Sequence, residues 1–401
     1  SISGSDVKEA RPNQSVRTPS ARRDVAATCV AFMLLLFVPL ALVGLGLGRD
    51  EQIMREWEFR LPSPRPPLPL SVADVMAFPW RWDAYWSDAF PHRSPLIHLQ
   101  AFVRHRLLGA NAPKKIFLED GFVFDVKDVD QFRGKRVLPA DELDAFMRVL
   151  RAKREFFGKA GIAYYFVLAP NRLDFHRDVV PAAFQLPAQN VWAAQIRERL
   201  SPDLREFFIM PDETMRAAQE RWPDRPLYYK RDGHWNQWGR VVAAAAIVQC
   251  MQKAFPALPT LDPNAVPVVA APEDQTFWGD VRMLGLAFDD LPAAMTAVVA
   301  PAWTEQCQRL AAETNRCPLS LAYTSDSFME ILSDRSPEIL SFGKVTWLGL
   351  SQFDRLNSPE NCRQALDLRP DVVLEGKALG AIDFADYLRK NAAWLKTEAA
   401  P

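Results

Sequence analysis

Cysteine and histidine are scarce in this chain, with five of each among 401 residues. The cysteines never form a C-x-x-C pair, and the histidines contain no H-E-x-x-H motif. Zinc sites and thiol-redox centres usually show such spacings. We therefore expect neither a metal nor a cofactor.

Net charge is almost absent as well, because 48 basic residues are balanced by 49 acidic ones. A chain without a positive field has no long-range attraction for a polyanion, so we expect no nucleic-acid partner. A hydrophobic content of 49% and an aromatic content of 11% exclude disorder of the whole chain. The length fits one large domain or two ordinary ones.

The strongest positive signal is an uncharged run at residues 25–48, VAATCVAFMLLLFVPLALVGLGLG. It exceeds the roughly 20 residues that cross a bilayer as a helix. The preceding segment, residues 1–24, carries the basic residues Lys8, Arg11, Arg17, Arg22 and Arg23. The positive-inside rule leaves this segment in the cytoplasm and predicts a single-pass inner-membrane anchor with the rest of the chain in the periplasm. A cleaved secretory signal is the less favoured alternative, because its apolar core is only about 7 to 15 residues long.

Residues 49–75 are expected to form a proline-rich linker. The stretch LPSPRPPLPL, residues 61–70, cannot form a helix and should run as a stiff, extended spacer. It precedes a globular domain that we place at residues 76–401.

A periplasmic location permits disulfides. Cys307 and Cys317 flank a polar loop and are the pair that closes most easily. Cys250 and Cys362 are candidates for a second pair, although the sequence leaves the connectivity open.

The globular part alternates helices with short apolar strands. Helical periodicity predicts helices at residues 141–161, 212–222 and 236–255. Apolar runs of strand length occur at residues 163–169, 207–210, 319–324, 345–350 and 371–375. This alternation indicates an α/β fold with a mostly parallel sheet covered on both faces. Residues from about 258 to 318 interrupt the rhythm with prolines and polar loops, and we interpret them as an insertion or lid beside the sheet.

Ligands of open α/β sheets bind beyond the carboxyl ends of the strands, so the residues that follow each predicted strand deserve inspection. Three such junctions are polar: residues 170–172, 232–234 and 325–328. A serine needs a base within hydrogen-bond reach and a third group that orients the base. Ser327, His234 and Asp232 supply these three roles. Asn171 is a further hydrogen-bond donor for an oxyanion.

Each of these residues also has a structural explanation. Ser327 with Glu330 fits the S-x-x-E capping box, and Asp232 with His234 fits a surface turn before a helix. Asn171 after a proline fits ordinary turn chemistry. His176 is a rival base, but nothing pairs with it convincingly. Trp235, Trp238 and Trp278 would stack on sugar rings if exposed, although we favour core positions for them.

Six blocks of sequence, taken together and in this order, resemble the SGNH-hydrolase-like domain of the alginate O-acetyltransferases and related proteins that acetylate bacterial exopolysaccharides. The resemblance covers roughly residues 80–380. The blocks are YWSDAFPHR (85–93), FLEDGFVFDVKD (117–128), VLAPNRLDFHRDVVP (167–181), RDGHWNQWG (231–239), GDVRMLGL (279–286) and TSDSFMEIL (324–332).

The resemblance implies an SGNH-like three-layer α/β/α fold. It assigns the family's nucleophile to Ser327, its base to His234 and the orienting acid to Asp232. Ser327 would accept an acetyl group and pass it to a polysaccharide hydroxyl that His234 deprotonates. In such systems a separately encoded multi-pass membrane O-acyltransferase handles the acetyl donor, so the resemblance also implies that partner at the inner membrane.

Residues expected to bind the oxyanion or the substrate are Asn171, Asp326, Trp235 and Glu375. Two positions depart from the family pattern: Ser325 replaces the usual glycine before Asp-Ser, and Glu375 is followed by glycine and lysine instead of arginine. These departures leave two alternatives open. One is a carbohydrate acetylesterase with the same triad, and the other is a non-catalytic scaffold that binds polysaccharide in the export complex.

Overall fold

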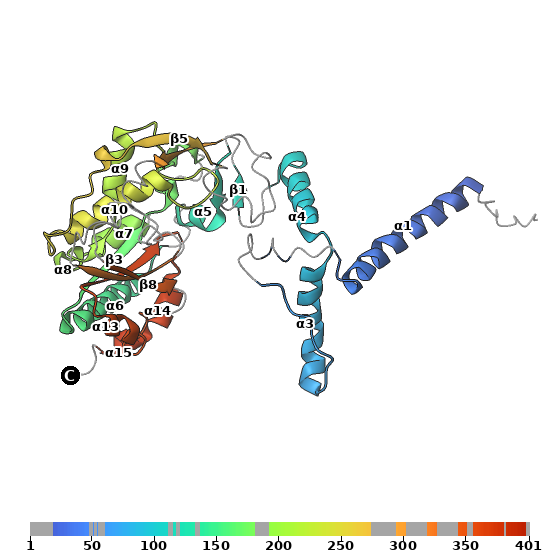
Figure 1. Cartoon of the computed structure of the whole chain (residues 1–401), viewed down its shortest axis with the longest axis horizontal. Coiled ribbons are helices and arrows are strands. Elements are labelled where there is room, and N and C mark those ends of the chain that lie inside the picture. The colour runs from blue at the N-terminus through green and yellow to red at the C-terminus, as the bar shows by residue number, and fades with distance from the viewer. Residues whose placement is uncertain are drawn as a thin grey trace, which may run out of the picture. The chain divides into compact units, whose positions relative to one another are not determined.

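The computed structural model describes residues 19–47, 51, 54, 61–110, 115–117, 121–132, 137–180, 192–273, 294–301, 319–326, 344–350, 356–380 and 382–397. The chain divides into two compact units, Ser1–Gln100 and Ala101–Pro401, which are described separately below. Figure 1 shows the helices α1, α3 and α4 of the amino-terminal part and the sheet-containing unit that follows.

The first unit consists, in its described parts, mainly of helices, with the proline-rich residues 61–70 outside any helix or strand. Helix α1 (Pro19–Gly44) contains the apolar run, and its portion Arg23–Gly44 is long and apolar enough to cross a membrane. A single membrane span and a signal sequence share these properties. Helix α3 (Val72–Ala89) follows the proline-rich stretch, and α4 (Arg93–Phe102) leads into the second unit through the π-helical turn η1 (Val103–Leu107).

A five-stranded parallel sheet forms the centre of the second unit, with the order β4-β3-β9-β7-β8. The strands are β3 (Ala163–Ala169), β4 (Phe208–Ile209), β7 (Ser320–Ser325), β8 (Lys344–Leu350) and β9 (Val372–Ala378). Their parallel direction brings all their carboxyl ends to one edge, where β9 lies between β3 and β7. Because neighbouring strands are about 4.8 Å apart, the ends of β3 and β7 are separated by roughly 10 Å.

Helices cover both faces of this sheet, as Figure 1 shows. Alternate side chains of β3 point to opposite faces: the Phe166 ring contacts Phe146 of α6 (Ala140–Lys159), whereas Tyr165 lies near Cys250 of α10 (Gln237–Met251). On the α6 side lie α14 (Phe384–Lys390) and α15 (Ala392–Thr397), and on the α10 side lies α9 (Asp212–Arg221). The predicted α/β/α class is therefore confirmed.

Shorter elements complete the unit. They are the helices α5 (Val126–Phe132), α7 (Trp192–Arg199), α8 (Pro202–Arg205) and α13 (Arg363–Leu368), and the 3-10 turns η2 (Arg172–Asp174), η3 (Arg177–Val179) and η6 (Pro263–Ala265). Two antiparallel pairs lie outside the main sheet. Strand β1 (Lys115–Phe117) pairs with β2 (Val123–Asp125), and β5 (Val268–Pro272) pairs with β6 (Met295–Val299), within the range expected to be an insertion.

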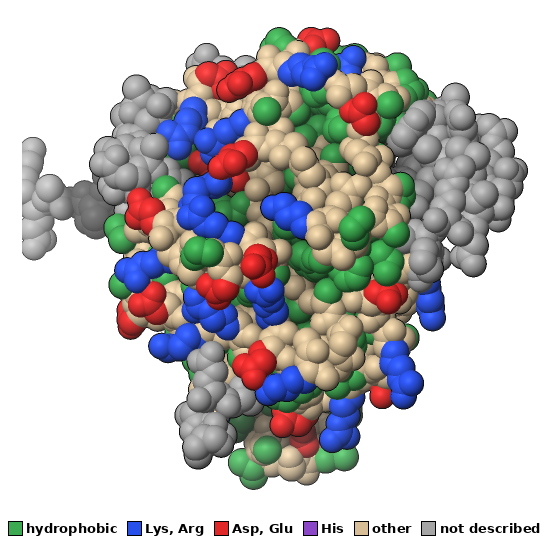
Figure 2. All heavy atoms as spheres, turned by 90° about the vertical axis from the view of Figure 1, so that its left-hand side faces the viewer, with side chains coloured by type: hydrophobic (Ala, Val, Ile, Leu, Met, Phe, Trp, Pro, Cys, Tyr) green, Lys and Arg blue, Asp and Glu red, His purple; other side chains and the backbone are tan. Residues whose placement is uncertain are grey.

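Charged side chains of both signs intermingle on the face of the molecule shown in Figure 2, without a patch of a single sign. Ion pairs join many of the exposed charges of this unit, for example Arg151 with Asp203 at 2.8 Å and Arg154 with Glu206 at 2.5 Å. Exposed pairs of this kind contribute only about 0 to 1 kcal/mol each. The fold therefore depends on its core.

The cysteine prediction needs one correction. Cys250 and Cys362 are both free thiols, so the second disulfide suggested from the sequence is wrong. Cys250 is on α10 and Cys362 directly precedes α13, and no local pattern determines how far apart these two helices place the thiols. Cys307 and Cys317 lie outside the described residues, and their pairing stays a prediction.

Candidate active site

Asp232 and His234 form a closed hydrogen-bonded pair. The Asp232 Oδ1 atom accepts a hydrogen bond from the His234 backbone N–H at 2.8 Å and lies 2.5 Å from Nδ1 of the His234 ring. The pair belongs to a loop that is closed by a bridge between Tyr228 and Trp235. Since Nδ1 is engaged by the carboxylate, Nε2 is the ring nitrogen that can exchange a proton with a substrate or a nucleophile.

The environment of Asp232 favours its ionised form. Burial of the carboxyl group acts to raise its pKa, but the charge and the hydrogen bonds of His234 outweigh burial, so the pKa lies below its usual value. The carboxylate is almost fully buried, whereas a quarter of the His234 side chain is exposed (25%). An ionised, buried acid that orients a partly exposed imidazole is the arrangement of the base half of a catalytic triad.

Arg172 connects the Asp232 loop to other parts of the domain through several hydrogen bonds. Its Nη1 donates to the backbone carbonyls of Tyr229 at 2.8 Å, Lys230 at 3.2 Å and Asp232, and its Nη2 donates to the carbonyl of Val123. The guanidinium group also stacks on the Phe124 ring, with its carbon 4.4 Å from the ring centre. Sequence reasoning assigned no role to Arg172, although its place at a strand end was visible.

Replacing Arg172 with lysine is expected to lower the turnover number of the enzyme by about 10²-fold. One ammonium nitrogen cannot reach both the carbonyls of the Asp232 loop and the carbonyl of Val123, so the Asp232–His234 pair should shift. Steady-state kinetics of the full chain would measure it. The matched control is Arg154→Lys, since Arg154 also pairs with a carboxylate, that of Glu206, and stacks on an aromatic ring, that of Phe207. Equal turnover in both variants would contradict a positioning role.

The strand end next to the Asp232 loop carries Asn171. Its side-chain oxygen accepts a hydrogen bond from the backbone N–H of Leu173 at 2.9 Å, which begins the 3-10 turn η2. Its amide nitrogen lies on the side of Gly380: a Cβ at Gly380 would be 3.8 Å from that nitrogen and 2.5 Å from Asp128 Oδ1. The turn role is thus shown, and the role as an oxyanion donor stays a prediction.

The end of β7 carries Asp326, whose carboxylate accepts a hydrogen bond from the backbone N–H of Ala378 on β9 at 2.5 Å. The backbone N–H of Leu379 donates to the carbonyl of Ala169 on β3 at 2.8 Å. These bonds connect the ends of three adjacent strands. Ser327, the next residue after Asp326, lies outside the described residues, so its distance to His234 is not part of the structure.

The sequence was compared with known families and structures. Residues 131–312 match the family model described as SGNH hydrolase-like domain, acetyltransferase AlgX. This part of the chain is therefore similar to the SGNH hydrolase-like domain of the acetyltransferase AlgX. The match includes Asp232 and His234 and ends before Ser327, and it confirms the class of enzyme expected from the sequence, an acetyltransferase.

Solved structures of low sequence identity resemble the chain. The O-acetyltransferase domain of Pseudomonas putida AlgJ has 14% identity and a TM-score of 0.44, covering 70% of this chain and 100% of its own. Bacillus cereus PatB1 with a sulfonyl adduct has 14% identity and a TM-score of 0.46, covering 68% and 97%. Pseudomonas aeruginosa AlgX has 13% identity and a TM-score of 0.37, covering 70% and 65%. A search of the curated proteins gave no match.

The two tryptophans beside the Asp-His pair of the SGNH-like domain are core residues. Trp235 is 1% exposed and Trp238 is fully buried, and the Trp238 ring packs edge-on against Trp222 at 5.3 Å. Neither indole offers a face to a sugar. The core interpretation favoured from the sequence is therefore right for both, and the substrate contact expected of Trp235 is wrong. Trp278 lies outside the described residues.

Close packing fixes the start of the helix that follows these tryptophans. A Cβ at Gly239 would lie 2.0 Å from the Leu227 carbonyl oxygen, so any larger residue would push the helix from the loop. Asn236 caps the helix by accepting from the Gly239 N–H at 2.8 Å, and its amide donates to Thr296 Oγ1 at 2.9 Å. The motif RDGHWNQWG therefore specifies a loop, a cap and a close contact.

Glu375 is buried on the α6 side of the sheet. Its Oε2 accepts from Lys153 Nζ at 2.7 Å and from the Tyr164 hydroxyl at 2.7 Å, and its Oε1 accepts from the Tyr387 hydroxyl at 3.1 Å. Burial acts to raise the pKa of Glu375, but the charge of Lys153 and these hydrogen bonds lower it below its usual value. In the described structure these contacts are internal, and a substrate contact of Glu375 stays a prediction.

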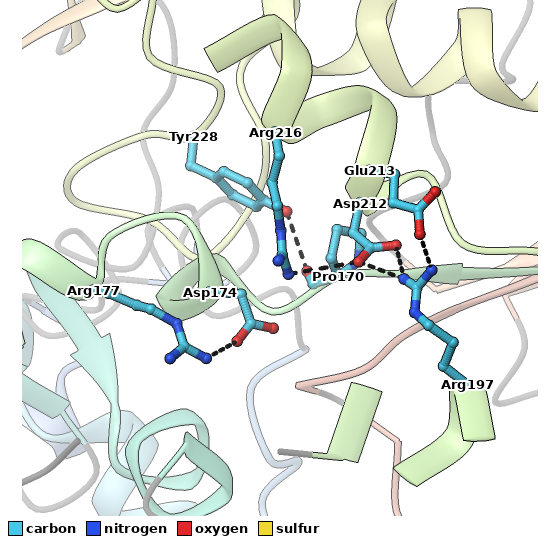
Figure 3. Close-up of polar contacts among 8 residues, drawn as sticks. All are labelled: Pro170, Asp174, Arg177, Arg197, Asp212, Glu213, Arg216 and Tyr228. Carbon is cyan, nitrogen blue, oxygen red and sulfur yellow. Dashed lines mark hydrogen bonds and ion pairs between the residues drawn. The ribbon is translucent and has the colours of Figure 1, made fainter. Parts of the chain in front are cut away.

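The loop after β3 is supported by a second polar cluster, shown in Figure 3. The Tyr228 hydroxyl donates to the Pro170 carbonyl at 3.1 Å, and Asp212 of α9 accepts two hydrogen bonds from Arg197 of α7 at 2.7 Å each. Asp174 of η2 pairs with Arg177 at 3.6 Å. Burial raises the pKa of Asp174 to about 6. These contacts fix the loop that carries Asn171 and Arg172.

Glu273, at the end of β5, is a buried carboxyl group that sequence reasoning missed. It accepts a weak hydrogen bond from the backbone N–H of Arg231 at 3.4 Å, one residue before Asp232. Burial raises its pKa to about 7. The only signal in the sequence was an acidic residue after an apolar stretch, which is common on surfaces. No group of three or more residues able to hold a metal ion occurs in the described parts of the chain.

Proposed function

We propose that the protein is a membrane-anchored O-acetyltransferase that transfers an acetyl group to hydroxyls of an exopolysaccharide through Ser327, His234 and Asp232. The observation that carries the proposal is the 2.5 Å contact between Asp232 Oδ1 and His234 Nδ1 in a domain of an acetyltransferase family. The acid is buried and the imidazole is accessible, as a general base requires.

The first half-reaction forms an acetyl-enzyme. The Ser327 Oγ attacks the acetyl carbonyl carbon of the donor while His234 Nε2 takes the hydroxyl proton. The bond between the acetyl group and the donor breaks, and His234 returns the proton to the leaving group. Asp232 stabilises the transient imidazolium without being protonated. The backbone N–H of Ser327 and the Asn171 amide are the groups we assign to the oxyanion.

The second half-reaction transfers the acetyl group to the acceptor. A sugar hydroxyl attacks the acetyl carbonyl while His234 Nε2 removes its proton. The bond to Ser327 Oγ breaks, and the proton passes from His234 to that oxygen, which restores the free enzyme. Acetyl transfer instead of hydrolysis requires that the sugar hydroxyl reaches the acetyl-enzyme more often than water does.

The membrane part of the proposal is supported by the apolar helix Arg23–Gly44 and by the basic residues that precede it. We assign the domain after α1 to the periplasm and α1 to the inner membrane. As acetyl source we propose a multi-pass membrane O-acyltransferase, in keeping with the family that the sequence resembles.

Replacing Ser327 with alanine is expected to abolish polymer acetylation while the protein stays folded, because no acetyl-enzyme can form. Acetyl content of the polymer, produced with the full chain and its donor system, would measure it. Ser358→Ala is the matched control, since Ser358 lies in the loop before α13. Retained acetylation in Ser327→Ala would refute the proposal. If an added oligosaccharide does not change the rate of acetyl release, the result would instead favour an esterase.

A further inference from the structure

Helix α3 presents an apolar stripe that nothing in the described residues of its unit covers. At 100° per residue, Val72, Val75, Met76 and Trp80 fall on one side of the helix. Val72 is 82% exposed, Met76 73% and Trp80 78%. Leu68 and Leu70, directly before the helix, are exposed too. A soluble surface rarely gathers large apolar side chains in this way, so the stripe indicates an interaction surface.

The opposite side of the helix is polar. Ser71 caps the helix by accepting from the Asp74 N–H at 3.1 Å, and the Asp74 carboxylate pairs with Arg81 at 3.3 Å. Asp74 and Arg81 lie about 180° from Val72 around the helix axis. Asp83 ends the stripe on the carboxyl-terminal side. The first three turns of α3 are therefore amphipathic.

The other end of α3 packs against the end of the apolar helix α1. Val43, one residue before the end of α1, is buried in a cluster with Tyr85 and Ala89 of α3. The backbone N–H of Ser63 donates to Asp88 at 2.8 Å, which ties the proline-rich stretch to the same end of the helix. If Arg23–Gly44 crosses the bilayer, Val43 lies where the hydrocarbon meets the headgroups, and α3 begins its contact at that level.

We propose that the amino-terminal half of α3 lies in the headgroup boundary of the membrane that α1 crosses, with Val72, Val75, Met76 and Trp80 directed into the lipid. This proposal rests on the membrane anchoring proposed above. Tryptophan favours this boundary because its ring is apolar and its N–H is polar, and amphipathic helices bind there with the apolar face inward. The packing against α1 favours lipid over a protein partner, because it connects the helix that carries the stripe to the end of the apolar span.

Fluorine NMR of the full chain in lipid nanodiscs tests the location of Trp80. The protein carries 5-fluorotryptophan, and the Trp80 signal is assigned as the one lost in Trp80→Phe. We expect spin-labelled lipid to broaden this signal and a water-soluble relaxation agent to leave it sharp. Trp347 of β8, which is 53% exposed, is the matched control and should respond in the opposite way. A Trp80 signal that responds only to the water-soluble agent, or to neither agent, would overturn the proposal. The second outcome would indicate a protein partner for the stripe.

A release assay tests how strongly the apolar stripe of α3 binds the membrane. A protease site inserted after residue 48 is cleaved in vesicles that hold the full chain. We expect most of the released domain to stay on the vesicles. The double variant Met76→Glu with Trp80→Glu should raise the fraction that leaves the vesicles about tenfold or more. The control is Arg81→Glu, which changes the net charge by the same two units on the side of the helix opposite the stripe. Equal release from the double variant and this control would contradict lipid binding. An alkaline wash before cleavage shows separately whether α1 is inserted, and neither readout depends on acetyl transfer.

Discussion

Replacing His234 with glutamine is expected to lower the rate of acetyl transfer by about 10⁴-fold or more. Glutamine can occupy the space and accept or donate a hydrogen bond, but it cannot take a proton from Ser327 or from the sugar hydroxyl at neutral pH. Asp232→Asn should cost a similar factor, because an amide no longer selects the tautomer in which Nδ1 carries the proton. Initial rates of acetyl transfer to an oligosaccharide acceptor, with the protein at equal concentration, would measure both effects.

The control for this prediction is His176→Gln. His176 is the rival base in the sequence. The structure places its ring centre 4.9 Å from that of Phe122, and its Nε2 atom is buried. Burial, with the nearby charges of Arg172 and Lys230, lowers the pKa of His176 to about 3, so this ring stays neutral. We expect the folded His176→Gln variant to retain most of the activity of the native protein. Loss of activity in His176→Gln together with retention in His234→Gln would reverse the assignment of the base.

The largest expected effect on stability comes from the buried pair of Lys153 and Glu375. Lys153→Met removes the cation that donates a hydrogen bond to the Glu375 carboxylate at 2.7 Å and leaves that carboxylate in the core, where the charge of Lys377 also acts on it. Breaking a buried ion pair in this way costs about 3 to 5 kcal/mol. Denaturant unfolding followed by circular dichroism would measure the loss. The double variant with Glu375→Leu is expected to recover most of it, because the buried charge is gone.

The pH dependence of Lys153→Met provides a second check. In the native protein the folded-state pKa of Glu375 is lowered, so its contribution to stability is present above the unfolded pKa and lost as pH falls through the folded value. In Lys153→Met the charge of Lys153 no longer opposes the effect of burial, so the folded-state pKa of Glu375 should rise. The deficit of the variant relative to the native protein should then shrink at low pH and grow toward neutral pH. A deficit independent of pH would show that lost packing, not charge, causes the destabilisation.

The secondary structure of the acetyltransferase domain could be predicted well from local sequence. The helix expected at 141–161 is observed as α6 and the strand expected at 163–169 as β3, because amphipathic periodicity and apolar runs are local signals. The strand order could not be predicted. It depends on which strands pair, and β9 lies between β3 and β7 although it follows both in sequence.

In the candidate active site, too, local features could be predicted from the sequence and long-range contacts could not. The Asp-x-His spacing was readable because the two side chains meet within one loop, where the carboxylate folds back onto the ring. The support of that loop was not readable, because Arg172 reaches carbonyls that are 57 to 60 residues away along the chain. The same holds for Glu375, whose partner Lys153 is 222 residues away.

The sequence by itself determined an apolar helix near the amino terminus, an α/β domain and an aspartate-histidine pair within one loop, since each depends on residues that are close along the chain. The short strand expected before that pair is only an isolated bridge between Tyr228 and Trp235. The tertiary structure alone decided that Trp235 and Trp238 belong to the core, that Cys250 and Cys362 stay free, and that Glu375 is neutralised by Lys153. Burial and pairing at these positions arise from segments that meet only when the sheet is assembled, and no local pattern encodes that meeting.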